Sequence, residues 1–416
     1  MKARCMRRVS GSLGVYISVP FCKAKCSFCN FASGVFAADR MQDYVDRVCQ
    51  EIVRARQSAA NLGAQVPTLV DTVYFGGGTP SLLAPAQIRQ IFEQLHGEFS
   101  FTPDAEVTLE CAPGQLSDET LAELLQQGMN RMSFGVQSFV DRESAAVGRL
   151  HTEQVCLEEL ARIRAAGIQN LNLDLIAGLP HQTEASWKYS LDTALQTGAP
   201  HVSIYMLEVD EDSRLGKEVL AGGTRYSASS VPSDDDAVSW YELACDVLGT
   251  NGVAQYEISN FARAGHQSRH NLKYWQRQPY LGFGLDAHSM LLTEGGATRF
   301  ANTSDLDVYS GEAAASSALS LRLYDTAVAV PEVDSIGETQ AFEESLFLGL
   351  RLNAGVSLQE LRSQFGEAML HEALPALYEV RDAGLLEMTA DRLRLTDRGR
   401  MVSNEVFSRL LLPLGV

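Results

Sequence analysis

Three cysteines fall within eight residues near the start of the chain. They are Cys22, Cys26 and Cys29, in the run Cys-Lys-Ala-Lys-Cys-Ser-Phe-Cys. Thiolates bind iron–sulfur clusters, and a four-iron cluster normally takes four protein ligands, one for each iron. Three thiolates would leave one iron free, and such an open position can bind a substrate or cofactor, as at a catalytic metal. The spacing therefore predicts a [4Fe-4S] cluster with one open iron.

A zinc site is the alternative for these thiols. Structural zinc is usually held by four ligands, often with paired C-x2-C spacings, and the chain has no second pair. The other cysteines are scattered and resemble ordinary buried residues: Cys5, Cys49, Cys111, Cys156 and Cys245. The cluster is therefore the preferred interpretation.

Composition limits the class of protein and its partners. The 416 residues are enough for two or three domains, and 45% of them are hydrophobic, as in ordinary globular proteins. The formal net charge of −18 disfavours contact with nucleic acids and anionic membranes. We find no secretory signal, and no apolar run approaches the roughly 18 residues that a membrane span needs. Because clustered thiols also suit a reducing compartment, we predict a cytoplasmic protein that binds no nucleic acid.

Short strands alternate with helices from about residue 14 to residue 260, which is typical of an α/β fold with a parallel sheet or barrel. The expected strands are Val15–Val19, Thr72–Phe75, Ala105–Glu110, Arg131–Val136, Leu171–Ile176, Val202–Met206 and Gln255–Ile258. The expected helices lie around Asp43–Ala59, Ala86–Leu95, Asp118–Gln127 and Glu153–Ala166.

Polar and apolar residues alternate along these strands. In one of them Leu171, Leu173 and Leu175 oppose Asn172 and Asp174. One face of the sheet is therefore apolar and suited to covering helices. The polar face must line a hydrated or ligand-filled interior, because buried polar groups need partners. A complete (β/α)8 barrel fills its interior with apolar side chains, so we expect an incomplete, TIM-like (β/α) barrel around a large cofactor.

The pattern divides the chain into four parts. We expect an N-terminal extension over 1–13, a core barrel over 14–250, a connecting region over 251–334 and a C-terminal domain over 335–416. Residues 209–236 are rich in Gly, Ser and Asp and predict an irregular acidic connection. The C-terminal part resembles a winged-helix domain, with helices over 356–364 and 367–383, a hairpin over 385–396 and a final helix. Residues 351–400 hold seven Arg and Lys against eight Asp and Glu, which favours a helical domain packed on the barrel over DNA binding.

Three consecutive glycines follow an expected strand, in the run Gly-Gly-Gly-Thr-Pro at 76–80. Glycines at a strand end permit positive φ angles and let a ligand lie directly on the main chain. Together with the C-x3-C-x2-C spacing, this segment resembles the radical S-adenosylmethionine (SAM) enzymes. The resemblance is closest to the oxygen-independent coproporphyrinogen III oxidase family and covers nearly the whole chain. The matching runs are YISVPFC at 16–22, GGGTP at 76–80, FGVQSF at 134–139, VGRLH at 147–151 and NLDLIAGLP at 172–180.

The resemblance implies a set of cofactor contacts. Cys22, Cys26 and Cys29 would hold a [4Fe-4S] cluster whose open iron binds SAM, and a flavodoxin or ferredoxin type of protein would donate the electron. The residues matched to contacts with SAM, or with a second SAM-like ligand, are Tyr16, Phe28, Gly77, Gly78, Thr79, Glu110, Gln137, Arg149 and Asp174. Glu110, Gln137 and Asp174 also lie in the C-terminal halves of expected strands, where barrel sites are found. Arg149 rests on the family match alone.

The chain departs from the family pattern in two places. The family usually follows the glutamate with Ala-Asn-Pro, whereas Glu110 is followed by Cys111-Ala112-Pro113, so an amide that could orient a neighbouring ligand is missing. The oxidases carry a fourth cysteine two residues after the third, where this chain has Phe31. That pattern resembles the HemW branch, whose members are proposed to bind heme and pass it to acceptor proteins.

A second motif also resembles the HemW branch. The run His270-Asn-Leu-Lys-Tyr274-Trp275 matches H-N-x-x-Y-W. A histidine can ligate heme iron, and the two aromatic residues offer flat apolar surface for a macrocycle. The alternative is a histidine that is hydrogen-bonded in the interior, among aromatic residues that simply pack. His288 is a second candidate, for heme or for contact with SAM.

Three functions remain open at this point. The resemblance implies a heme chaperone with a radical SAM core, with heme-accepting proteins as partners and transient contact with membrane proteins left open. The enzymatic alternative is oxidative decarboxylation of coproporphyrinogen in porphyrin biosynthesis, which the absent fourth cysteine disfavours. A cluster-bearing nucleic-acid regulator is the third, and the acidic composition disfavours it.

Overall fold

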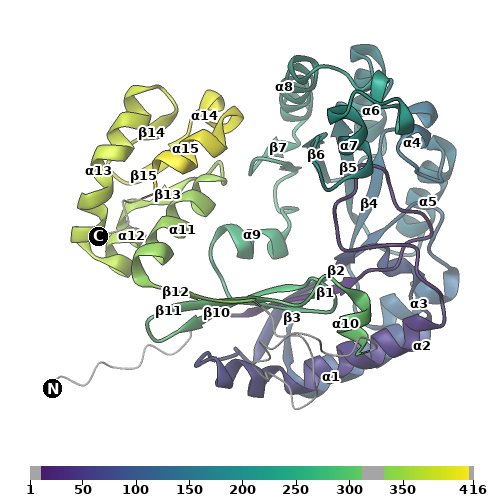
Figure 1. Cartoon of the computed structure of the whole chain (residues 1–416), viewed down its shortest axis with the longest axis horizontal. Coiled ribbons are helices and arrows are strands. Elements are labelled where there is room, and N and C mark those ends of the chain that lie inside the picture. Colours follow the sequence, from purple (N-terminus) through teal and green to yellow (C-terminus); the bar gives the residue numbers. More distant parts are fainter. Residues whose placement is uncertain (1–10, 312–331, 412–416) are drawn as a thin grey trace.

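Twelve strands form one open sheet in the computed structural model, which describes residues 11–311 and 332–411 (Figure 1). The strands lie in the order β12-β11-β10-β9-β1-β2-β3-β4-β5-β6-β8-β7. The edge strands β12 and β7 do not pair with each other, so the barrel is incomplete, as expected. Residues 1–10 of the expected N-terminal extension lie outside the described residues.

Strands β1 to β6 are parallel, and β9 runs parallel to β1 on its other side. The strands of the large sheet are β1 Leu13–Val19, β2 Leu69–Gly77, β3 Ser100–Cys111, β4 Arg131–Gln137, β5 Asn170–Ala177, β6 His201–Met206, β7 Ala254–Gln255, β8 Asn260–Ala262, β9 Tyr280–Phe283, β10 His288–Thr293, β11 Gly296–Ala301 and β12 Glu332–Ile336. The parallel arrangement brings the C-terminal ends of β1 to β6 and β9 to one edge of the sheet.

Helices cover the outer face of the parallel part (Figure 1). The helices up to the connecting region are α1 Arg40–Asn61, α2 Pro85–Glu98, α3 Asp118–Gln126, α4 Asp141–Ala146, α5 Glu153–Ala165, α6 Glu184–Gln196, α7 Arg214–Leu220 and α8 Asp234–Thr250, with short 3-10 helices over Pro80–Leu82 and Arg225–Ser230. Several begin at a side-chain cap, for example at Ser117, Thr152 and Thr183, whose oxygens accept a backbone N–H of the first turn.

The alternation of residues along the strands separates a dry face from a polar one. Val15, Ile17 and Leu173 are fully buried in the layer between the sheet and its helices. Asp174 and Glu110 point to the other side, where they line a small polar cavity in the interior of the barrel. The prediction of a polar interior is confirmed.

Two predictions about the connections were wrong. The expected strand Gln255–Ile258 is a tight antiparallel turn instead, because β7 ends at Gln255 and pairs with β8, and Tyr256 N donates to Asn260 O at 3.0 Å. The expected irregular segment 209–236 contains α7, and its acidic run forms the first turn of α8. Ser233 caps that helix by accepting the N–H of Asp236, and acidic residues stabilise the positive end of the helix dipole.

The connecting region extends the sheet at both edges, with β8 and β7 beyond β6 and β9 to β12 beyond β1; the strands beyond β1 were not predicted. Strands β9 to β12 all come from it or its border, and α9 Arg269–Trp275 and α10 Leu306–Ser310 lie within it. Figure 1 shows α9 between the barrel and the C-terminal domain.

The C-terminal part folds as expected, as helices with a hairpin, and a short strand at Val356–Ser357, where the expected helix over 356–364 begins, adds a third strand to that hairpin. Its elements are α11 Glu338–Leu350, β13 Val356–Ser357, α12 Leu358–Phe365, α13 Glu367–Asp382, β14 Leu386–Met388, β15 Arg392–Leu395, α14 Asp397–Met401 and α15 Ser403–Arg409. It has a hydrophobic core of its own, formed by residues such as Phe342, Leu377 and Leu393. Within the described ranges, no helix is long and apolar enough to cross a membrane.

Candidate functional site

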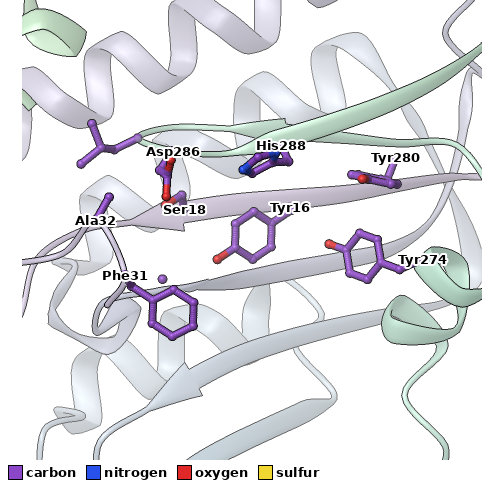
Figure 2. A pocket seen from close by; sticks show the side chains of 10 residues that line it. Tyr16, Ser18, Phe31, Ala32, Tyr274, Tyr280, Asp286 and His288 are labelled. Atoms are coloured by element: carbon purple, nitrogen blue, oxygen red, sulfur yellow. The ribbon is translucent and has the colours of Figure 1, made fainter. Parts of the chain in front are cut away.

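A cavity of about 290 Å³ opens at the C-terminal ends of β1 and β2, against β9 and β10 (Figure 2). Most of its lining falls into two groups, the glycine wall and the aromatic wall. The glycine wall consists of Tyr16, Ser18 and Gly77, and the aromatic wall consists of Tyr274, Tyr280, Leu285, Asp286 and His288. Phe31 and Ala32, from the cysteine loop, complete the cavity.

The three cysteines lie in the loop that follows β1, beside this cavity. The loop closes on itself through Cys22 N to Gly34 O and Gly34 N to Pro20 O, each 2.9 Å. Cys26 is buried, and Cys22 and Cys29 are half-buried. Burial raises the pKa of the Cys22 thiol, the Thr79 hydroxyl lowers it, and the nearby Cys29 and Cys26 raise it further. The loop thus holds three thiols near one another without forming disulfides.

The glycines after β2 hold the cysteine loop through main-chain contacts. Gly78 N donates to Val19 O, and Thr79 N donates to Phe21 O, both at 2.8 Å. A Cβ atom on Gly78 would lie 2.7 Å from Val19 O and 2.8 Å from Phe21 O, so only glycine fits. Gly77 has a φ of 100°, which a side chain would strain.

Glu110, at the end of β3, reaches back to the same glycines. Its Oε1 accepts the Tyr74 hydroxyl at 2.8 Å, and its Oε2 accepts Gly77 N at 3.2 Å. Burial raises the pKa of Glu110 to about 7, with a further contribution from Asp174 and a partial offset from the two hydrogen bonds. Near neutral pH this carboxyl can therefore bind a cation or release a proton.

Arg149 and Gln137 meet at the end of β4. Gln137 adopts a left-handed φ of 69°, at an irregularity in the pairing of β4 with β5. Arg149 donates to Gly135 O, and its Nη1 lies 3.5 Å from Cys26 Sγ. Its Nε has no hydrogen-bond partner among the described residues. The structure thus places Arg149, which only the family match had indicated, directly beside a cysteine of the loop.

Asp174 lies deeper, in the polar interior of the barrel. Its carboxylate accepts the Ser133 hydroxyl at 3.1 Å and the Asn172 amide at 2.8 Å, and burial raises its pKa. The interior cavity there measures about 40 Å³, enough for a few small groups only. Polar side chains surround it: Tyr74, Glu110, Arg131, Ser133, Asn172, Asp174, His201, Ser203, Tyr205, Asn260, Ser268 and Asn271.

Comparison with known proteins identifies the family. Residues 16–194 match the Radical SAM superfamily, and residues 337–402 match the HemN C-terminal domain. The heme chaperone HemW of Bacillus subtilis is 32% identical over 397 residues, which cover 95% of this chain and 98% of that protein. The chain belongs to the HemW family of radical SAM proteins.

Other members of the HemW family and its relatives extend the comparison. HemW of Mycobacterium tuberculosis is 33% identical over 96% of this chain and 94% of that protein. The mitochondrial radical S-adenosyl methionine domain-containing protein 1 of Bos taurus is 32% identical, covering 95% of this chain and 87% of its own. The solved coproporphyrinogen III oxidase HemN of Escherichia coli superposes with a TM-score of 0.79 at 22% identity, covering 98% of this chain and 91% of that one. This likeness shows a common fold.

A radical SAM domain implies a [4Fe-4S] cluster and SAM as cofactors. The residues of the cysteine loop fit such a cluster, because Cys22, Cys26 and Cys29 are free thiols of one loop whose Phe31 and Ala32 line the cavity. No three His, Cys, Asp or Glu side chains of the described residues are arranged to hold a single metal ion.

His270 of the H-N-x-x-Y-W motif lies in the interior rather than at the cavity. Its Nδ1 bonds Thr72 Oγ1 at 2.9 Å, and its Nε2 bonds the Tyr274 hydroxyl at 2.8 Å. Burial lowers the pKa of His270 to about 3, so the ring is neutral. Both ring nitrogens are engaged, as in the structural alternative considered for this histidine, and an axial role for His270 stays a prediction that requires breaking one of these bonds.

The two aromatic residues of the motif face different ways. Tyr274 lines the cavity, whereas Trp275 lies under Arg351, whose guanidinium carbon is 4.4 Å from the centre of the ring. Beside it, Glu344 of α11 accepts Arg277 Nε at 2.6 Å and Arg299 Nη2 at 2.5 Å. Helix α9 is therefore held by the barrel on one side and by the C-terminal domain on the other.

Phe28, another predicted SAM contact, is not among the residues that line the cavity. Phe28 packs against the apolar cluster of Val147, Ile176 and Leu179. Tyr280, Leu285 and Asp286 also line the cavity and were not among the predicted site residues. The sequence feature that could have indicated them is the run Gly282-Phe-Gly-Leu-Asp286. It ends β9 as the glycine triplet ends β2.

Proposed function

We propose that this protein binds heme and passes it to acceptor proteins, and that its radical SAM core carries a [4Fe-4S] cluster and SAM. The proposal rests on one observation: the chain is 32% identical, over 95% of its length, to a relative named heme chaperone HemW. The position two residues after the third cysteine supports it, because Phe31 stands there and is 63% exposed at the cavity.

The cysteine loop and the glycine wall would hold the cofactors. Cys22, Cys26 and Cys29 would bind the cluster, which together with SAM supplies one-electron chemistry when both are bound. Gly77 and Gly78 leave the main chain open, so the methionyl part of SAM can lie against it. Tyr16, Phe28, Thr79, Gln137, Arg149 and Asp174 remain proposed SAM contacts from the family match.

Glu110 would bind the amino group of SAM through its carboxylate. Its two oxygens already accept Tyr74 and Gly77, which fixes their direction beside the glycine wall. Because the pKa of Glu110 is raised to about 7, part of the population is protonated near neutral pH. An ammonium group favours the ionised form, so SAM binding should strengthen as the pH rises through 7.

The aromatic wall would contact the heme. Tyr274 and Tyr280 stand edge to face with their ring centres 4.6 Å apart, and such rings offer apolar surface with a polar tip. Trp275 was proposed for the same role from the motif, and its position under Arg351 gives it contact with the C-terminal domain instead of the cavity.

The partners follow from the same proposal. Heme-accepting proteins would take the cargo, and a flavodoxin or ferredoxin type of protein would reduce the cluster. A cytoplasmic location would suit the thiols of the loop, since reducing compartments keep them free. The acidic chain would meet acceptors through direct contact and not through nucleic acid.

A paired assay tests the proposal on protein whose cluster has been reconstituted anaerobically. Hemin is titrated into the protein and followed by its Soret band, and the loaded protein is then mixed with an apo heme protein. We expect saturable binding and transfer of the heme. In parallel, coproporphyrinogen III is supplied with SAM and a reductant. Robust formation of protoporphyrinogen without heme transfer would overturn the chaperone function in favour of the oxidase activity.

A further inference from the structure

We propose that Asp286 binds the positively charged sulfonium of SAM and makes the cavity select SAM over S-adenosylhomocysteine, whose sulfur is uncharged. The residue lies in the turn between β9 and β10 and lines the cavity. The inference rests on the SAM site of the proposed function and adds to that site a residue that determines its specificity.

The turn that carries Asp286 is fastened to helix α1. Gly284 N donates to Glu51 Oε2 at 2.9 Å. Leu285 N donates to the Tyr44 hydroxyl at 2.8 Å. Both side chains of α1 are buried, so the turn rests on a fixed base. The main chain of Asp286 is therefore held in place at the edge of the cavity.

Asp286 occupies a position in this turn that usually belongs to glycine or asparagine. Ala287 N donates to Gly284 O at 3.3 Å, which makes Asp286 the third residue of the turn. Its φ is 56°, and a positive φ at the third residue favours Gly or Asn. An aspartate in a turn commonly bonds the nearby main chain. This carboxylate instead forms no hydrogen bond with the described residues and faces the cavity, which points to a ligand.

The carboxylate of Asp286 has little positive charge around it. Among the described residues, no lysine or arginine lines the cavity. Lys25 and Arg149, at the cysteine loop, each donate to a main-chain oxygen outside the turn. Partial burial raises the pKa of Asp286, and the His288 ring lowers it. A cationic ligand in the cavity would hold the carboxyl in its ionised form.

Two carboxylates at this site match the two positive groups of SAM. Glu110 reaches the cavity from the glycine wall, where its Oε2 accepts Gly77 N at 3.2 Å. Burial raises the pKa of Tyr16, and the charges of Glu110 and Asp286 raise it further, so the Tyr16 phenol lies within range of both. The ammonium group of SAM is assigned to Glu110. The sulfonium is the second cation, and Asp286 is the second carboxylate.

Asp286 lies at the end of the cavity that faces the cysteine loop. Figure 2 shows its side chain beside Ser18 and Ala32, whereas Tyr274 and Tyr280 lie at the opposite end. Ala32 follows the third cysteine by three residues, so the open iron and the methionyl part of SAM belong at this end. The sulfonium adjoins the methionyl part. Asp286 is therefore placed to contact it, and the two tyrosines are not.

Binding of SAM and S-adenosylhomocysteine to four proteins tests the assignment, because the two compounds differ only by a methyl group and the charge that it confers on sulfur. The proteins are the wild type and the variants Asp286→Asn, Asp286→Gly and Glu294→Gln. Asparagine and glycine both tolerate the left-handed φ, so the turn should persist. Glu294, exposed at the tip of the β10–β11 hairpin, removes the same charge outside the cavity lining.

Equilibrium dialysis is run at pH 8 on protein whose cluster has been reconstituted anaerobically. Glu110, whose pKa is raised to about 7, is then largely ionised in every protein. We expect the wild type to prefer SAM, and both Asp286 variants to lose about fivefold or more of that preference. The loss should come from weaker binding of SAM, with binding of S-adenosylhomocysteine unchanged. Glu294→Gln should match the wild type.

The outcomes separate this inference from the function on which it rests. A wild type that binds neither compound would overturn the SAM site itself. An unchanged preference in Asp286→Asn and Asp286→Gly would overturn the role of Asp286 alone. Equal weakening of both compounds would also overturn it, because it would show that the residue only supports the turn. Circular dichroism and iron content check the fold and cluster of each variant, and heme transfer is measured separately.

Discussion

The glycine wall and the aromatic wall enclose one cavity but are built by different means. On the glycine wall the main chain at Gly77 forms part of the surface, and the adjacent Gly78 packs so closely against Val19 O and Phe21 O that no side chain fits. On the aromatic wall the surface is made of side chains, with Tyr280 and His288 on neighbouring strands. Main-chain surfaces tolerate little change, whereas side-chain surfaces can vary and still pack. We therefore expect changes on the glycine wall to cost more than changes on the aromatic wall.

Removal of the three thiols should have the largest effect. In the triple variant Cys22→Ala, Cys26→Ala, Cys29→Ala, we expect iron content and visible cluster absorbance to fall to background. Hemin affinity should stay within about threefold of the wild type, because the aromatic wall is left intact. Cys245→Ala, a half-buried thiol on α8, is the matched control and should keep its iron. Iron retained in the triple variant would sink the ligand assignment.

Gly78→Ala should come next. The added methyl group meets backbone oxygens of the cysteine loop at 2.7 and 2.8 Å, so the loop must move. We expect a loss of unfolding free energy of about 1–3 kcal/mol and weaker SAM binding, measured by urea unfolding and by equilibrium dialysis. Gly97→Ala, near the end of α2 with open space around it, should be neutral or stabilising by up to about 1 kcal/mol. Equal stability of the two variants would show that the close contact is unimportant.

Glu110→Gln should change how stability depends on pH. The pKa of Glu110 is raised to about 7, so the folded protein holds a proton that the unfolded chain has released above about pH 4.5. Wild-type stability should therefore fall as the pH rises from about 4.5 to about 7, and the variant should lack this loss. At pH 8 we expect the variant to be more stable by about 1–3 kcal/mol in urea unfolding. The exposed Glu119→Gln on α3 is the control, and parallel pH curves for Glu110→Gln and the wild type would contradict the prediction.

Tyr274→Phe should have the smallest effect. It removes the hydroxyl that bonds His270 Nε2 at 2.8 Å but keeps the ring at the cavity. We expect a loss of about 1 kcal/mol in unfolding free energy, because a buried nitrogen loses its partner, and hemin affinity close to that of the wild type. Tyr378→Phe on α13 is the control for a half-exposed tyrosine. Complete loss of hemin binding in Tyr274→Phe would show that the two walls do not differ in tolerance.

The sequence predicted the barrel well because its signal is local. Alternation along Leu171–Leu175 fixes which residues face helices, and parallel pairing then brings Glu110 and Asp174 to one interior. Strand β9, which joins β10 to β12 to the sheet, could not be predicted in the same way, since it is only four residues long and its parallel partner β1 lies near the start of the chain. The cysteine loop was predicted from spacing alone, because thiolates bind metal wherever the loop holds them together.

The H-N-x-x-Y-W motif shows the limit of such prediction. Consecutive residues of a helix point about 100° apart, so Tyr274 and Trp275 must face different neighbours once α9 is placed. The partner that occupies His270 is Thr72, which lies 198 residues earlier in the chain. A motif indicates that residues act together, but the hydrogen bonds that occupy a ring nitrogen come from the tertiary structure.

The double anchorage of α9 makes this chain hard to shorten. A protein cut after β12 would leave Arg277 in the barrel without Glu344, its buried counter-ion, and would expose the face of Trp275 that Arg351 covers. An unpaired buried cation is costly, and α9 would shift to hydrate it. Because Tyr274 lies on the same short helix, a truncated barrel would lose part of its cavity even though no cavity residue had been deleted. Studies that separate the two domains should therefore keep Glu344 and Arg351 attached to the barrel, or replace Arg277 when the C-terminal domain is removed.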